Sequence, residues 1–337
     1  MESLTKKRIS KYEAKQLFEE SGIGTAESIN EINESEFSSV FKVTSGGKVY
    51  YIKFGPDPEA QTLFYEKDLI NVELRVHAIL DAHASETTAP RHPKVVYSDN
   101  TLQKVNVGYI ITEGFDVPLK GLTFPNLELR KRMMLQFGQD LAKLHKIKGT
   151  GYGYMQIGTE TTWAEAYKKM VDRVLADATV LNVRFDSSRI YNVITRAEPI
   201  LKEMDDCALV NGDVSYYNVF VDRKKFNYQG LVNWGKAFYG DPLTDLVSLR
   251  PTRSIESNRW FVKGYTSVTN TVPDYKIRVR ANLMRLYIGL IMLTELEVRF
   301  KKNSLAYLTH RSVGRRVLKK ALSTLEKPYN EQTKGII

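Results

Sequence analysis

The sequence predicts an α+β chain in two lobes, a small β-rich lobe over residues 1–115 and a larger, mainly helical lobe over residues 116–337. Three observations indicate this organisation. Apolar and polar residues alternate with the period of strands around the turn at Gly46 and Gly47. Beyond residue 127 apolar residues recur mostly at helical spacing. A chain of 337 residues is also long enough for two such units.

The first lobe is expected to begin with a helix and continue into a β-hairpin. Residues 11–30 predict a helix followed by a short linker, with Tyr12, Leu17 and Phe18 as its apolar contacts. Residues 37–54 predict two strands, because the alternation continues on both sides of a Gly-Gly turn.

A helix and two further strands complete this lobe. Residues 59–82 contain no strong breaker and favour one long helix, which the following prolines end. Residues 95–97 and 107–112 have the apolar character of strands, and residues 114–121 form a connector to the second lobe.

The second lobe is expected to be helical with one β-rich insert. Residues 127–145 have the spacing of an amphipathic helix, and residues 162–205 and 254–325 are mainly helical. Residues 208–238 lie between these helical regions and predict short strands.

Composition narrows the class of protein. The chain is 42% hydrophobic and 26% charged, as is usual for soluble globular proteins. No apolar run approaches the roughly 20 residues of a membrane-spanning helix, and the charged N-terminus lacks the apolar core of a signal peptide, so a cytoplasmic location is expected. Cys207 is the only cysteine and lies in an apolar run, which predicts a buried packing residue.

The net charge of +10 is concentrated near the C-terminus. Residues 246–337 contain 18 Lys and Arg against 6 Asp and Glu, a net charge of +12. The basic run at residues 310–320 is either a solvated helix face or a surface for something anionic. No aromatic residues interleave with its cations, which argues against a nucleic acid partner.

The stretch LVNGDVSYYNVFVD at residues 209–222 carries the chemistry. Asp213 and Asn218 have the D-x-x-x-x-N spacing of a kinase catalytic loop, in which the aspartate accepts the substrate hydroxyl proton and the asparagine holds a metal ion. The loop follows an apolar strand and precedes a predicted hairpin. That hairpin brings Asn233 back beside the loop, where a second metal ligand belongs.

At these residues the chain resembles the aminoglycoside phosphotransferase and choline-kinase-like family, whose signature runs L-V-H-G-D-x-x-x-x-N-x-L-V-D and later I-D-W-x-x-A-x-x-G-D-P-x-x-D-L. Residues 230–246, GLVNWGKAFYGDPLTDL, match the second part. The resemblance implies a two-lobed protein-kinase-like fold. We interpret Asp241 and Asp245 as carboxylates that tie the following helix to the catalytic loop, and His145 as structural.

The same resemblance implies a nucleotide site between the lobes. Lys53 resembles the strand lysine that grips the phosphates, and Glu73 resembles its helix partner, with Glu66 as a rival. Residues 109–115 resemble the hinge that takes the adenine, with Glu113 and Phe115 as binding residues.

Ser38 and Ser39 belong to the turn that covers the phosphates in this family. Residues 35–39 contain no glycine, in contrast to many family members. Serine hydroxyls can still donate hydrogen bonds to phosphate, so both residues are candidate nucleotide ligands.

Two departures from the family signature affect activity. The family's loop histidine is Asn211, and its metal-binding aspartate is Asn233. Because Mg²⁺ depends on one or two protein carboxylates, a neutral amide at position 233 weakens the metal site. Asn211 is less damaging, since an amide can replace some hydrogen bonds of the imidazole.

The resemblance implies an ATP-dependent phosphotransferase that moves the γ-phosphate to a hydroxyl of a small molecule, an antibiotic or a metabolite. ATP and Mg²⁺ are the expected cofactors, with Asp213 catalytic and Asn218 and Asn233 as metal ligands. The alternative is a catalytically silent, pseudokinase-like binding or regulatory protein. The basic C-terminal region favours a neutral or anionic acceptor, although acids before the catalytic loop leave a cationic one open.

Overall fold

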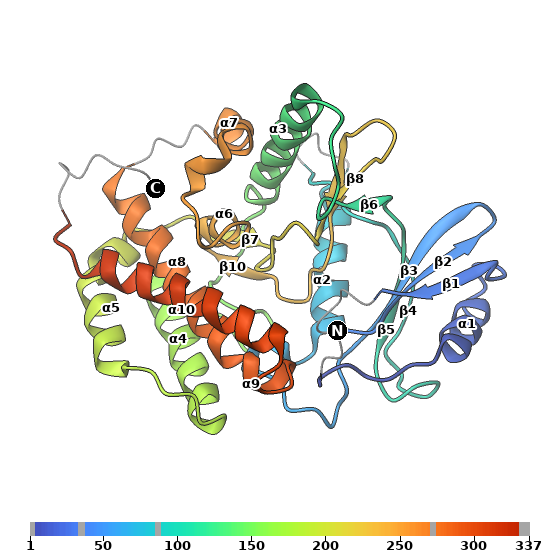
Figure 1. Ribbon diagram of the computed structural model, residues 1–337, viewed down its shortest axis with the longest axis horizontal. Helices are drawn as coiled ribbons and strands as arrows, with labels where there is room; N and C mark the ends of the chain where they lie inside the picture. Colours follow the sequence, from blue (N-terminus) through green and yellow to red (C-terminus); the bar gives the residue numbers. More distant parts are fainter. Residues whose placement is uncertain (1–3, 33–37, 85–88, 270–273, 330–337) are drawn as a thin grey trace.

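The computed structural model describes residues 4–32, 38–84, 89–269 and 274–329. Its N-terminal part is a five-stranded antiparallel sheet in the order β1-β2-β3-β5-β4. The strands are β1 (Ser28–Glu31), β2 (Val40–Ser45), β3 (Lys48–Phe54), β4 (Val95–Asp99) and β5 (Tyr109–Glu113). Figure 1 shows this sheet at one end of the molecule and most of the helices at the other. The predicted α+β class with a β-rich and a helical part is confirmed.

The predicted hairpin is β2–β3. Gly46 and Gly47 have φ angles of 55° and 71°, a left-handed conformation that glycine adopts without steric cost. The turn therefore fixes the register that pairs Lys53 with Val40. Residue 37, at the predicted start of the first strand, lies outside the described residues.

Two helices of the N-terminal part differ from the sequence prediction. In α1 (Lys11–Glu20) Leu17 and Phe18 are buried, but Tyr12 is 76% exposed, so its predicted apolar contact is wrong. The single helix predicted over residues 59–82 is also wrong, because α2 spans only Leu69–Ala82. Asp68, with φ of 62°, precedes it in the left-handed region, which interrupts a helix.

The C-terminal part is mainly helical. Its helices are α3 (Leu127–Leu144), α4 (Trp163–Val180), α5 (Ser187–Lys202), α6 (Leu243–Ser248), α7 (Arg259–Thr269), α8 (Tyr275–Thr294), α9 (Leu296–Arg299) and α10 (Leu305–Leu325). Short strands form two small sheets: β6 (Val117–Pro118), β8 (Val219–Val221) and β9 (Tyr228–Leu231) in one, and β7 (Ala208–Val210) with β10 (Phe238–Gly240) in the other. Helix α3 packs on α7 and α8 packs on α10.

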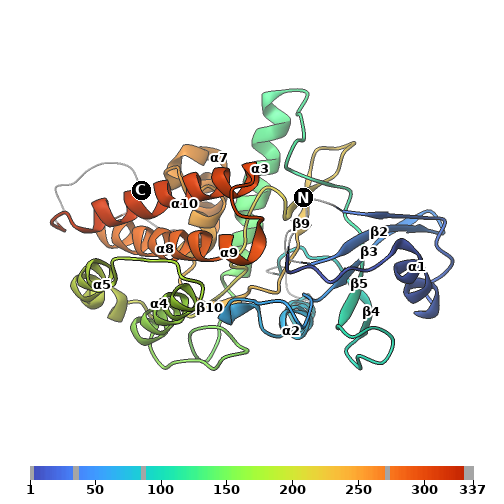
Figure 2. The ribbon, with the colours of Figure 1, turned by 60° about the horizontal axis from the view of Figure 1, so that its bottom comes forward.

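The helix α2 joins the two parts. Its buried residues Val72, Val76 and Leu80 belong to the large core of the C-terminal part, whereas the sheet and α1 have a smaller core of their own. Figures 1 and 2 both show α2 between the sheet and the helices. Cys207 is buried in the large core, as predicted, and burial raises the pKa of its thiol.

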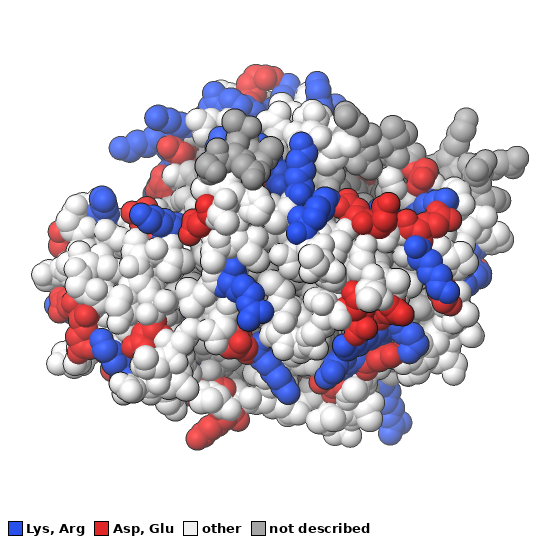
Figure 3. Space-filling model, turned by 180° about the vertical axis from the view of Figure 1, so that it is seen from behind, with Lys and Arg blue, Asp and Glu red and all other residues white. Residues whose placement is uncertain are grey.

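Helix α10 buries its apolar face and exposes its cations. In α10 the apolar residues Val317, Leu322 and Leu325 are buried, while Arg315 and Lys319 are exposed. On the opposite face of the molecule, which Figure 3 shows, cations and anions are interspersed. None of the helices in the described ranges is both long enough and apolar enough to cross a membrane.

Candidate active site

Lys53 and Glu73 meet where β3 faces α2. Side chains of β3 alternate between burial and partial exposure, which places Lys53 on the face directed at the C-terminal part. Its ammonium donates to the carboxylate of Glu73, which is 4% exposed. The rival Glu66 instead pairs with Arg299 and accepts a hydrogen bond from the Leu63 amide at 2.8 Å. Glu73 is thus the partner of Lys53.

One carboxylate of α6, that of Asp245, fixes the loop after β7. The Asp245 carboxylate accepts hydrogen bonds from the main-chain amides of Asn211 and Gly212, both at 2.8 Å. Its Oδ2 also lies 3.2 Å from His145 Nε2. Gly212 has φ of 76°, and a Cβ there would lie 2.5 Å from the Lys236 carbonyl oxygen. The predicted structural roles of Asp245 and His145 are confirmed.

Asp241 does not play the part predicted for it. Its buried carboxylate lies 3.0 Å from Arg280 Nε and accepts from the Leu243 amide at 3.0 Å, so it ties α6 to α8 rather than to the loop. Burial raises the pKa of Asp241, an effect that Arg280 opposes.

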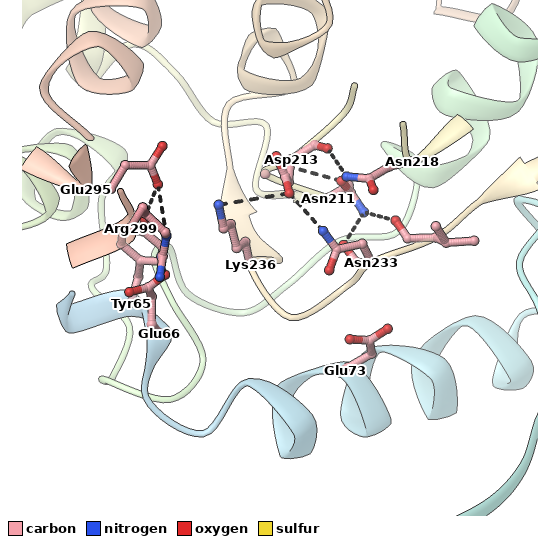
Figure 4. Close-up of polar contacts among 12 residues, drawn as sticks. Tyr65, Glu66, Glu73, Asn211, Asp213, Asn218, Asn233, Lys236, Glu295 and Arg299 are labelled. Carbon is pink, nitrogen blue, oxygen red and sulfur yellow. Dashed lines mark hydrogen bonds and ion pairs between the residues drawn. The ribbon is translucent and has the colours of Figure 1, made fainter. Parts of the chain in front are cut away.

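Asn211 links the loop to the returning hairpin. Its side-chain nitrogen Nδ2 donates to the main-chain carbonyl of Asn233 at 3.1 Å. Its side-chain oxygen Oδ1 accepts from the main-chain amide of Asp213, also at 3.1 Å. Asn218 closes the loop by donating to the Asp213 carbonyl at 2.8 Å. The amide at position 211 thus positions Asp213 through hydrogen bonds (Figure 4).

Asp213, Asn233 and Lys53 form a continuous chain across the two parts of the molecule. Asn233 Nδ2 donates to Asp213 Oδ2 at 2.8 Å, and Lys53 Nζ donates to Asn233 Oδ1 at 2.6 Å. Asn233 has φ of 66°, a conformation that Asn adopts more readily than most residues. The hairpin therefore returns position 233 to the loop, as the sequence predicts.

Lys236 is a site residue that sequence reasoning missed. Its Nζ lies 3.9 Å from Asp213 Oδ2 and 5.6 Å from the ring centroid of Tyr65. A lysine three residues after position 233 is an ordinary surface residue in the sequence. Only the return of the β9–β10 connection, visible in Figure 4, places it beside Asp213.

The two predicted serine ligands are buried. Ser38 and Ser39 are 1% and 2% exposed. Ser39 donates its hydroxyl to the Lys7 carbonyl at 2.5 Å, so in this arrangement it ties the N-terminal segment to the sheet rather than facing a ligand. The rest of the predicted phosphate-covering turn, up to residue 37, lies outside the described residues.

Aromatic side chains meet at the predicted hinge. The ring centroid of Phe220 lies 6.1 Å from that of Phe115 and 6.2 Å from that of Tyr51. The planes of the Tyr51 and Phe220 rings are nearly perpendicular. Burial and the nearby Asp116 raise the pKa of Tyr51 to about 12, so its phenol stays protonated. Glu113 has an exposed side chain, and its amide is bonded to the Lys94 carbonyl at 2.8 Å. Tyr51 and Phe220 were missed because they come from different lobes.

The predicted metal ligands fit a magnesium ion poorly. Mg²⁺ prefers charged oxygen ligands, but Asn218 and Asn233 are neutral, and Asn233 Oδ1 already accepts from an ammonium. The described part of the chain contains no cluster of three or more His, Cys, Asp or Glu side chains suited to a metal ion. The donor set does not favour a tightly held divalent cation.

Comparison with solved structures identifies the fold. No protein-family model and no curated protein sequence matches the chain. The aminoglycoside phosphotransferase APH(4)-Ia, as a thermostable mutant, matches with a TM-score of 0.64 at 17% identity, covering 95% of this chain and 100% of the other. A protein assigned as a fructosamine-3-kinase from Haemophilus somnus matches with a TM-score of 0.65 at 13% identity, covering 93% and 97%.

Another structure of the APH(4)-Ia mutant is a ternary complex with AMP-PNP and hygromycin B. It matches with a TM-score of 0.63 at 17% identity, covering 93% of this chain and 99% of the other. The chain therefore has the protein-kinase-like fold of small-molecule phosphotransferases and kinases.

Proposed function

We propose that the protein is an ATP-dependent phosphotransferase that acts on a hydroxyl of a small molecule. The observation that carries the proposal is the meeting of Lys53, paired with Glu73, and Asp213 at the single residue Asn233. This arrangement puts a cation for phosphate and a base for a hydroxyl within one interlobe site. The fold shared with phosphotransferases supports the same activity.

Asp213 is the proposed base and Lys53 the proposed phosphate ligand. In the transfer, the acceptor oxygen bonds to the terminal phosphorus and the bond from phosphorus to the bridging oxygen of ADP breaks. The hydroxyl proton passes to the carboxylate of Asp213, whose side chain is 28% exposed and thus reachable by an acceptor.

The base of the nucleotide is proposed to enter between Tyr51 and Phe220. A stacked base needs about 3.5 Å on each of its faces. The centroids of the two rings are 6.2 Å apart and the ring planes are nearly perpendicular. The Tyr51 ring must therefore turn before a base can stack there. Phe115 lies beside both rings at the hinge.

A neutral or anionic acceptor is proposed. A polycationic acceptor needs several carboxylates that are available to it. Most acids before the catalytic loop already have partners within the protein: Glu160 with Lys169, Glu165 with Thr162, Asp172 with Lys168, Asp177 with the Phe64 amide and Asp206 with Lys148. Asp205 is exposed, and one carboxylate is too few for a polycation. Lys236 adds a positive charge beside Asp213.

Transfer of labelled γ-phosphate from ATP to a panel of cationic, neutral and anionic hydroxyl compounds tests the proposal. Asp213→Asn is expected to lower turnover at least about 100-fold, because the amide cannot accept the proton. ATP affinity measured by calorimetry should stay within about threefold, because Asp213 faces the acceptor.

Asp205→Asn is the matched control, since Asp205 is an exposed acid of the same lobe. Turnover that survives Asp213→Asn would contradict the mechanism. The neutral amide at Asn233 favours one second candidate, a nucleotide-binding regulatory protein. That candidate predicts ATP binding with no transfer to any member of the panel.

A further inference from the structure

The charges around Asp213 alternate along a single chain of contacts. Glu73 pairs with Lys53, Lys53 donates to Asn233, Asn233 donates to Asp213, and Asp213 pairs with Lys236. Two cations and two anions are thus linked through one neutral amide. The cluster is electrically balanced without a bound cation.

The amide at position 233 is what makes this balance possible. Its nitrogen is 2.8 Å from Asp213 Oδ2, a distance at which two carboxylates would repel each other. An aspartate at 233 would therefore need a cation between the two side chains. Asn233 removes that need, because one amide donates to Asp213 while its oxygen accepts from Lys53.

Lys236 is held in place by an aromatic side chain. Its ammonium lies 5.6 Å from the ring centroid of Tyr65, within the range of a cation–π interaction. The Tyr65 ring stacks on Tyr154, with centroids 5.9 Å apart, and its hydroxyl donates to Glu295 at 3.3 Å. The Lys236 side chain is only 13% exposed, so its charge is directed into the site rather than into solvent. Figure 4 shows Lys236 between Tyr65 and Asp213.

We infer that Lys236 and Lys53 together supply the positive charge for the terminal phosphate of the nucleotide, so that nucleotide binding depends little on divalent cations. Lys53 approaches the Asn233–Asp213 pair from one end and Lys236 from the other. Both ammonium groups can donate charge-assisted hydrogen bonds to phosphate oxygens. The inference rests on the proposed function, because it assumes that the interlobe site takes a nucleotide.

Calorimetry with ATP and ADP, in Mg²⁺ and in EDTA, tests this inference on the full chain. The parent protein is expected to bind ATP in EDTA within about threefold of its affinity in Mg²⁺. Lys236→Met keeps the aliphatic stem against Tyr65 and removes the charge. It should weaken ATP about tenfold and ADP distinctly less, because the missing contact is to the terminal phosphate. Lys236→Arg should restore ATP binding.

Asn233→Asp is the second variant, and it does not remove any side chain from the packing. It is expected to make ATP binding depend on Mg²⁺, because two adjacent carboxylates then require a cation. Lys224→Gln, at an exposed lysine of the β8–β9 turn, is the matched control and should bind ATP like the parent.

The outcomes separate this inference from the proposed function. ATP binding that requires Mg²⁺ in the parent and is unchanged in Lys236→Met overturns the inference and leaves the phosphotransferase standing. A folded parent that binds no ATP with or without Mg²⁺ overturns both. Circular dichroism on each variant shows whether lost binding reflects lost structure.

Discussion

His77 is a buried histidine one helical turn after Glu73. It is 2% exposed, and neither ring nitrogen has a hydrogen-bond partner within the described ranges. Burial lowers its pKa from 6.5 to about 4, with smaller effects from Glu73 and Asp81, which favour protonation, and from His92 and Lys53, which oppose it. The imidazole is therefore neutral in the folded protein, and a proton binds the unfolded chain first.

Stability should fall as the pH drops from 6.5 to about 4. The folded pKa is below the unfolded one, so this stability is complete above pH 6.5 and is lost toward the folded pKa, by about 3 kcal/mol at most. His77→Leu should flatten this part of the profile in urea unfolding. His83→Leu, at a half-buried histidine of the same segment, is the variant for comparison. Equal slopes for the parent and His77→Leu would show that another group titrates.

The catalytic loop and α6 act as one element. Asp245 supplies both acceptors for the amides of Asn211 and Gly212, so the loop geometry depends on one carboxylate from the next helix. His145, itself bonded to the Tyr265 hydroxyl at 2.8 Å, keeps that carboxylate in place. The position of Asp213 thus depends on contacts that the loop makes with α6 and, through Asp245, with His145 at the end of α3.

Asp245→Asn should destabilise the protein and also impair transfer. The new amide group can accept only one of the two main-chain hydrogen bonds, which leaves a buried donor unpaired at a cost of about 2 kcal/mol. Turnover should fall because the loop that carries Asp213 is displaced. Asp241→Asn is the control: it removes a buried carboxylate of the same segment without touching the loop. Urea unfolding and turnover, measured on both, should separate the two effects.

Local patterns predicted the elements whose structure is decided locally. The β2–β3 hairpin follows from alternation around Gly46 and Gly47. Asp213 was singled out by its spacing to Asn218, whereas Lys53 was singled out only by the resemblance to a known family. The start of α2 was missed because the left-handed conformation of Asp68 leaves no pattern in the sequence. Lys236 was missed because its partner Tyr65 lies far from it in the sequence, before α2.

At the scale of the whole molecule, one buried arginine ties distant segments together. Arg299 is 1% exposed and pairs with Glu66, lies 4.0 Å from Glu295, and donates to the Thr5 hydroxyl at 2.8 Å. The Leu4 amide donates to its carbonyl at 3.3 Å. One polar cluster therefore joins three segments: the N-terminal segment, the region before α2, and helix α9.

Arg299→Met should be strongly destabilising. Removal of the guanidinium leaves the buried Glu66 carboxylate without its cation, at a cost of about 4 kcal/mol. The double variant Glu66→Gln/Arg299→Met should recover part of this loss, and a double-mutant cycle in urea unfolding measures the coupling. Arg189→Met removes the exposed ion pair with Glu326 and should cost less than about 1 kcal/mol. Similar losses in the two arginine variants would argue against the buried cluster.

The separation of 294 residues between Thr5 and Arg299 has a consequence for synthesis. A chain grows from its N-terminus, so Thr5 and Glu66 leave the ribosome long before Arg299 does. Until Arg299 has been synthesised, the Glu66 carboxylate lacks the cation that pairs with it when it is buried. We therefore expect Tyr65, which contacts Lys236 and adjoins Glu66, to take up its final position only after Arg299 has been synthesised. The β2–β3 hairpin can form early in synthesis, whereas we expect the interlobe site to form only after α9 has been synthesised.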